Sequence, residues 1–167
     1  MASRPLESLL ADLEHRDVSM DTIHALAHKG DPAAVDPLIR KFDDPNILIW
    51  HRAADAVAAI AQHKNVLKQT RNEIFAKLCR LLDHDDPQVR ESAATALGYI
   101  GGERAAQEVM RLLDDEDADV RGNAAFVMGF LHYSPALEAV KRLTRDRSKA
   151  VRESARRALR ELSSEFF

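Results

Sequence analysis

The chain contains 167 residues with a formal net charge of −3, and 46% of its residues are hydrophobic while only 5% are aromatic. This composition supplies enough apolar surface for a continuous core, and the abundance of Ala and Leu favours close-packed helices over a β-sandwich. The net charge argues against a dedicated nucleic-acid binder. No apolar run approaches the roughly 20 residues that cross a bilayer, and the N-terminus lacks an apolar signal core, so a cytoplasmic protein is expected.

The N-terminal part is predicted to hold a leading helix followed by one irregular helical pair. Leu6 to His15 forms the leading helix, and residues 1–18 would cap the exposed end of the helical stack. Met20 to His28 and Ala33 to Phe42 form the pair, with Pro37 expected to kink the second helix because proline lacks a backbone N–H.

The next pair departs from the regular pattern. Asp44-Pro45 has the form of a helix start, although Ile47-Leu48 adds two residues before the first buried position. The partner helix lies within Asn65 to Leu82, and this pair is about nine residues longer than the later ones. Trp50 either packs at this distorted junction or is an exposed anchor. The only cysteine, Cys79, is expected to be a buried, reduced thiol.

The segment from Asp86 to Leu162 contains the same motif three times. Val89, Val120 and Val151 are each followed by arginine and are spaced 31 residues apart. A fixed period of this size is typical of stacked helical repeats.

The copy that begins at Asp86 defines the repeat unit. Asp86 is a candidate N-cap, Pro87 suits the first helical position, and Gly101-Gly102 stops the helix before Glu103 opens its partner. Neither helix can bury its apolar stripe alone, so neighbouring hairpins must share a core. The predicted fold class is all-α: a right-handed α-α superhelix, a HEAT-like solenoid of about five helical hairpins, in a single domain spanning residues 1–167. Residues 147–167 form a polar C-terminal capping helix and tail.

The motif from Asp86 to Gly101, Asp-x-x-Val-Arg-x-x-Ala-Ala-x-Ala-Leu-Gly-x-Ile-Gly, resembles the short HEAT repeats of the phycobilisome-lyase-like family. This resemblance implies that the helix carrying Val-Arg and Ala-Ala lines the concave side of the solenoid. It also implies a possible activity, attaching or handling a bilin or other tetrapyrrole, although the chain has no obvious nucleophile.

Under that orientation, side chains from successive first helices form a ladder on the concave face. Its aromatic part comprises Tyr99, Phe126 and Phe130, which a partner helix or peptide could bury. The alternative is that the phenyl rings turn inward and fill space left by Gly122 and Gly129. Polar flanking residues that would set specificity are Asn123, Glu91, His51, Arg52 and Arg157.

Histidines at helical spacing raise the question of a metal. His24 with His28, and His51 with Asp55, are weak candidates, and ordinary solvated histidines explain them equally well. HEAT-type deoxyhypusine hydroxylases hold iron with His-Glu pairs, and His51-Arg52 is not such a pair. No cofactor is therefore expected.

Arg90, Arg121 and Arg152 recur once per repeat near acidic residues, which predicts an ion-pair ladder that holds adjacent repeats in register.

The leading functional hypothesis is a non-catalytic scaffold or adaptor that binds a protein segment on the concave face. The alternative is a bilin lyase-like protein. A third possibility is nucleic-acid binding through the basic C-terminal repeat, although Glu91, Asp119, Glu153 and Glu161 interrupt the positive charge. No phosphate-binding loop, nucleophile elbow or paired cysteine motif is present.

Overall fold

The computed structural model describes residues 4–13, 15 and 18–163. Residues 1–3, 14, 16 and 17 of the predicted N-terminal cap and residues 164–167 of the predicted tail lie outside the described part. The chain divides into two compact units, residues 1–78 and 79–167.

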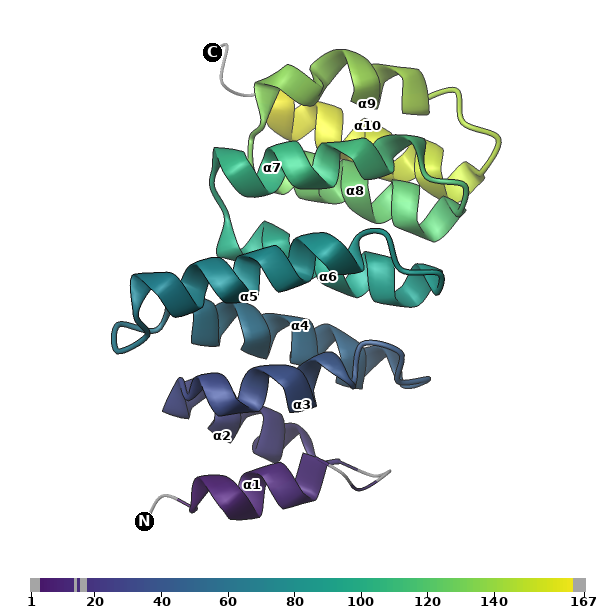
Figure 1. Cartoon of the computed structure of the whole chain (residues 1–167). Helices are drawn as coiled ribbons and strands as arrows, with labels where there is room; N and C mark the ends of the chain where they lie inside the picture. The colour runs from purple at the N-terminus through teal and green to yellow at the C-terminus, as the bar shows by residue number, and fades with distance from the viewer. Residues whose placement is uncertain (1–3, 14, 16–17, 164–167) are drawn as a thin grey trace. The chain divides into compact units, whose positions relative to one another are not determined.

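The described residues form ten α-helices and three 3-10 turns and contain no strand, which confirms the all-α class. The first unit contains α1 (Leu6–Leu13), α2 (Met20–Lys29), α3 (Val35–Ile39), α4 (Ile47–Gln62) and most of α5 (Lys68–Leu81). The second contains α6 (Pro87–Ile100), α7 (Glu103–Met110), α8 (Ala118–Phe130), α9 (Leu137–Leu143) and α10 (Lys149–Ser163) (Figure 1). The 3-10 turns are Pro32–Ala34, Arg111–Asp114 and Ser134–Ala136.

The helix start at Asp86 follows the prediction. The carboxylate of Asp86 accepts a hydrogen bond from the Gln88 N–H at 2.8 Å, and Pro87 occupies the first helical position. Asp117 caps α8 in the same way. Repeated caps start equivalent helices at equivalent residues.

The predicted helix start at Asp44-Pro45 is wrong. Asn46 caps α4 and accepts from the Leu48 N–H at 3.0 Å, while Asp44 accepts from the Asn46 N–H at 2.9 Å. Asn46 lies three residues before Ile49, as Asp86 does before Val89, and both apolar residues are buried. Burial of Ile49 therefore favours the later cap, and no residues are inserted within the helix.

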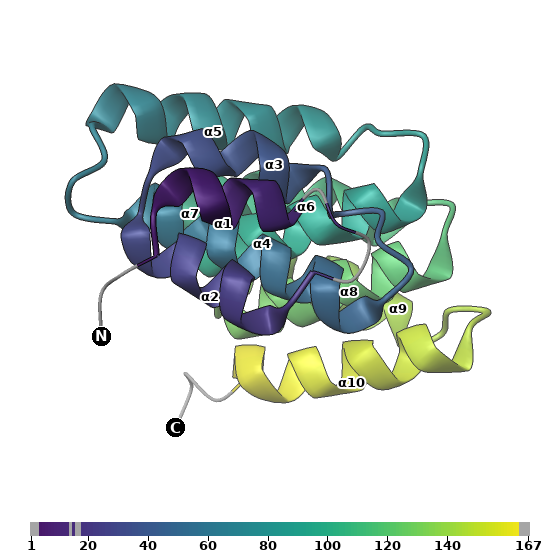
Figure 2. The ribbon, with the colours of Figure 1, turned by 90° about the horizontal axis from the view of Figure 1, so that it is seen from below.

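In the first unit, α2 packs against α4, α1 lies against α2, and α3 lies against α4. Figure 2 shows α3 and α5 in one row beside α2 and α4, and an ion pair between Lys77 and Asp36 joins α5 to α3. The segment predicted as one helix from Ala33 to Phe42 is shorter, because a 3-10 turn precedes α3 and the helix ends at Ile39. Trp50 is only 6% exposed, which excludes the exposed-anchor alternative.

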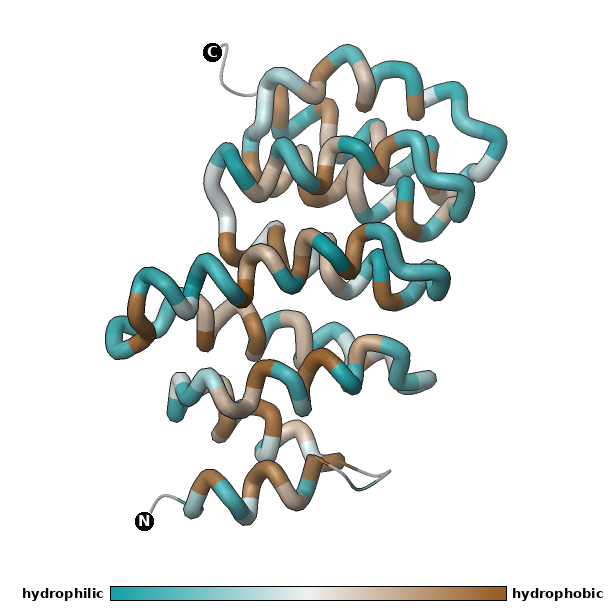
Figure 3. The backbone as a smooth tube through the Cα atoms, in the orientation of Figure 1, coloured by the Kyte–Doolittle hydropathy of each residue, from teal (hydrophilic) through white to brown (hydrophobic). Residues whose placement is uncertain are grey.

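In the second unit, α8 packs against both α6 and α10, and α7 and α9 form the other side. Figure 1 shows α7 in front of α8 and α9 in front of α10. Along the tube in Figure 3, brown apolar residues alternate with teal hydrophilic ones. The helices approach closely at glycines: a Cβ added to Gly129 would lie 2.8 Å from the Cα of Ala158, and one added to Gly98 would lie 3.0 Å from Val127.

Two of the three repeated arginines, Arg90 and Arg121, form the predicted ladder, while Arg152 donates only to backbone oxygens among the described residues. The guanidinium of Arg90 donates to the carboxylate of Asp115 at 2.9 and 2.8 Å, and that of Arg121 donates to Asp146 at 2.9 and 3.0 Å. Both arginines are buried, and these hydrogen bonds raise the pKa of Arg121 and lower that of Asp146. Each pair joins one repeat to the next.

Cys79 is half-buried rather than fully buried as expected. Burial is the main cause that raises the pKa of its thiol, which favours the protonated form. None of the helices that the structure describes combines the length and the apolar character that a membrane-spanning helix needs.

Candidate functional site

The aromatic surface of the second unit consists of Tyr99, Phe126 and Phe130. Phe126 and Phe130 are 43% and 49% exposed, and their rings are stacked with centroids 6.1 Å apart. Tyr99 meets Phe130 edge-on at 5.9 Å, which is a favourable aromatic geometry. The alternative that both phenyl rings fill the interior is therefore wrong.

The packing of α10 explains why these rings face outward. Ala158 lies against Gly129, and Ser154 and Val151 lie beside Gly122, so neighbouring side chains occupy the space that the glycines leave. Apart from Arg121 and Met128, the buried residues of α8 are small or aliphatic, such as Val120. No room remains there for a phenyl ring.

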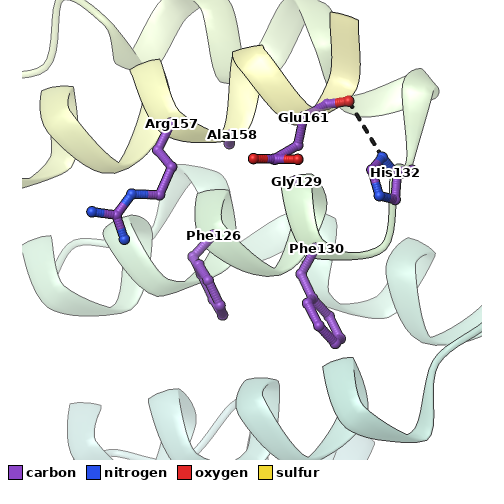
Figure 4. Close-up of a pocket in the computed structure, with 7 residues that line it drawn as sticks. All are labelled: Phe126, Gly129, Phe130, His132, Arg157, Ala158 and Glu161. Carbon is purple, nitrogen blue, oxygen red and sulfur yellow. Dashed lines mark hydrogen bonds between the residues drawn. The ribbon is translucent and has the colours of Figure 1, made fainter. Parts of the chain in front are cut away.

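Beside the aromatic surface lies a pocket of about 290 Å³ between α8 and α10 (Figure 4). Gly129 and Ala158 form its centre, and Phe126 and Phe130 extend side by side from α8. Its remaining lining residues are His132, Arg157 and Glu161. The pocket thus combines an apolar base with charged groups at its edge.

His132 lines the pocket although nothing in the sequence pattern indicated it. It follows α8 with a left-handed backbone, at φ 49°, and its Nδ1 lies 3.3 Å from the backbone oxygen of Glu161. The residues are 29 positions apart in the chain, so no local pattern could have indicated this contact.

Two predicted polar residues lie next to the aromatic surface. The side-chain amide of Asn123 donates to the backbone oxygen of Glu91 and to Oγ1 of Thr95, both at 3.0 Å. These bonds fix Asn123 against α6, and the residue is partly exposed. Burial, with smaller contributions from Asp119 and Asp117, raises the pKa of Glu91 to about 7.

His51 and Arg52 lie on α4 in the first unit and are not among the residues that line the pocket. Arg52 donates to the carboxylate of Asp55 at 3.0 Å, and Nδ1 of His51 lies 3.9 Å from the same group. Arg157, by contrast, lines the pocket directly.

The weak metal candidates are not brought together. Across residues 4–13, 15 and 18–163, no three His, Cys, Asp or Glu side chains are grouped so that they could hold a metal ion. His24 and His28 lie on α2, whereas His51 and Asp55 lie next to each other on the neighbouring α4.

A model of HEAT repeats matches residues 57–128 and 75–160 of the chain. No protein of curated function has a significant match. The complex of CpcE and CpcF of phycocyanin lyase from Nostoc sp. PCC7120 is similar in fold, with a TM-score of 0.61, 20% identity, and coverage of 98% of this chain and 67% of that chain.

Two engineered structures share the same architecture. A designed armadillo repeat protein in complex with the peptide (KR)4 has a TM-score of 0.52 and 22% identity, covering 95% of this chain and 82% of that chain. An engineered protein has a TM-score of 0.55 and 26% identity, covering 95% and 81%. The common feature is an all-helical repeat solenoid.

Proposed function

Because the chain belongs to the HEAT repeat family, whose stacked helices suit protein binding, we propose that it is a non-catalytic scaffold that binds a partner segment at the aromatic surface. The observation that carries this proposal is the pair of stacked phenylalanines, each nearly half exposed, beside a pocket. Exposed aromatic rings grouped over a concavity are typical of binding hot spots.

The energy available from these rings is substantial. A phenylalanine side chain buries on the order of 200 Å², so the exposed halves of two rings offer roughly 180 Å². At about 25 cal/mol per Å², covering them contributes about 4.5 kcal/mol before the costs of association. The rings would supply affinity, and an apolar partner side chain would fill the pocket.

Polar groups around the rings would then determine the specificity of partner binding. Asn123 is partly exposed and could form polar contacts with a partner, Arg157 offers a positive charge at the pocket, and Glu91, whose pKa burial raises to about 7, could form a hydrogen bond. His51 and Arg52 remain predicted contacts, which a separate H51A/R52A variant tests.

The proposal is tested with peptides selected from a phage-displayed library on the wild-type protein. Fluorescence polarisation then measures their affinity for F126A/F130A and for a matched control, L48A/L67A. Leu48 and Leu67 are 61% and 74% exposed and lie in the first unit. We expect the phenylalanine variant to lose more than about tenfold in affinity and the leucine variant to retain binding.

Circular dichroism of each variant controls for folding, since truncation of exposed rings should leave helicity unchanged. Peptides that bind F126A/F130A as tightly as wild type would refute this assignment of the site. A parallel titration with a bilin distinguishes the alternative function. An absorbance shift that requires Phe126 and Phe130, without any selected peptide, would favour chromophore handling instead.

A further inference from the structure

Two buried arginines of the second unit occupy the same kind of site. Nη1 of Arg90 donates to the backbone oxygens of His84 and Asp85 at 2.8 and 3.0 Å, and Nε and Nη2 grip the Asp115 carboxylate. Arg121 repeats this arrangement in the following loop and grips Asp146. The backbone oxygens orient each guanidinium so that its Nε–Nη2 edge faces a carboxylate.

Arg152 is the third copy of this site. Its Nη1 donates to the backbone oxygens of Asp146 and Arg147 at 2.7 and 3.1 Å, as in the other two copies. In the copies of Arg90 and Arg121, the aspartate that binds the guanidinium lies 25 residues further along the chain. For Arg152, no acidic side chain within the described ranges forms an ion pair with the guanidinium. The guanidinium of Arg152 is thus oriented like those of Arg90 and Arg121, but its Nε–Nη2 edge, the fork, holds no carboxylate from the described residues.

The surroundings of Arg152 exclude a further repeat packed in the usual way. Arg152, Arg156 and Arg160 are spaced four residues apart and form one stripe along α10. In the preceding repeat, Ala125 and Gly129 occupy the positions that correspond to Arg156 and Arg160, and both residues are buried. Close packing at Gly129 leaves no room even for a Cβ, so a helix cannot approach Arg160 as α10 approaches α8.

We propose that this arginine stripe is a docking site for an acidic segment of another protein, which places a carboxylate on the Nε–Nη2 edge of Arg152. The two internal pairs show which ligand this geometry accepts: a carboxylate held by two parallel hydrogen bonds. Arg156 and Arg160 would attract further acidic side chains of the partner. Because these two arginine side chains are long, the partner would pack less closely against α10 than α10 packs against α8.

A nucleic acid fits this surface less well than an acidic peptide. Duplex binding needs positive charge along an extended track. Glu153 and Glu161 are exposed on the same helix and interrupt such a track. A single oriented fork instead suits one carboxylate at a defined position.

The first test titrates a fluorescein-labelled peptide of alternating aspartate and alanine into the wild-type protein and single variants. R152Q removes the charged fork, R152K keeps the charge without the fork, and R145Q removes an equally charged, exposed arginine from the preceding loop. Because charge-assisted paired hydrogen bonds are lost, we expect R152Q and R152K each to weaken binding about tenfold. R145Q should change binding by no more than about twofold.

The second test reads the fork directly. The Nε–Hε resonance of Arg152 should shift on addition of the peptide toward the region of Arg90 and Arg121, whose Nε atoms already hold carboxylates. R152K also serves as the folding control, since its ammonium can still reach the loop carbonyls, and circular dichroism checks every variant.

Three results would overturn the proposal. One is an equal loss in R152Q, R152K and R145Q, which would indicate diffuse attraction alone. Another is tighter binding of duplex DNA than of the peptide at the same salt concentration. The third is an Arg152 Nε–Hε resonance that does not move at peptide saturation.

Discussion

Two glycines of α8 allow a sharp test of how closely α8 and α10 pack. Alanine has a higher helix propensity than glycine by up to about 1 kcal/mol. A Cβ at Gly122 would lie 3.5 Å from Oγ of Ser154 and 3.9 Å from Val151, which are ordinary contacts. We therefore expect Gly122→Ala to stabilise the protein by about 0.5–1 kcal/mol.

Gly129→Ala should have the opposite effect. Its Cβ would lie 2.8 Å from the Cα and 3.0 Å from the Cβ of Ala158, so the backbone of α10 must move. Overpacking of this kind costs about 1–3 kcal/mol and outweighs the gain in helix propensity. The expected net loss is about 1 kcal/mol.

Urea unfolding followed by circular dichroism measures both variants under the same conditions. The two substitutions add the same methyl group to the same helix, so each is the control for the other. If Gly129→Ala stabilised the protein as much as Gly122→Ala, the close approach of α10 would be wrong. Because Gly129 also lines the pocket, Gly129→Ala should weaken the binding of peptides whose affinity depends on Phe126 and Phe130.

Two further predictions concern charged groups. Arg121→Gln leaves the carboxylate of Asp146, which is only 10% exposed, without its partner and should cost about 3 kcal/mol in urea unfolding. Since Arg121 lowers the pKa of Asp146, that pair stabilises the protein above the ordinary pKa of 3.8 and loses its effect as the pH falls through the lowered value. Glu91 has the opposite sign: with a pKa raised to about 7, it destabilises the fold increasingly as the pH rises from its ordinary 4.5 through 7. Glu91→Gln should therefore raise the melting temperature more at about pH 8 than at about pH 5, and equal shifts at both would contradict the raised pKa.

The local features of the regular repeats could be predicted from the sequence because each depends on a few neighbouring residues. Asp86 and Pro87 define a helix start, and the spacing of Val89 and Val120 defines the repeat. The ladder of Arg90 and Arg121 followed from the same period. At the irregular junction this reasoning failed, since Asp44 and Asn46 are both good caps and burial of Ile49 selected the second.

By itself, the sequence determined the helical repeat, its caps and the set of aromatic residues from which a binding surface could be made. Only the tertiary structure decided that Phe126 and Phe130 point outward, that Trp50 is buried and that His132 joins the pocket. The physical reason is that helical periodicity places a residue on a face of its own helix. Whether that face is covered depends on how closely the next helix packs, and here Gly129 brings α10 near enough to leave the rings no interior space.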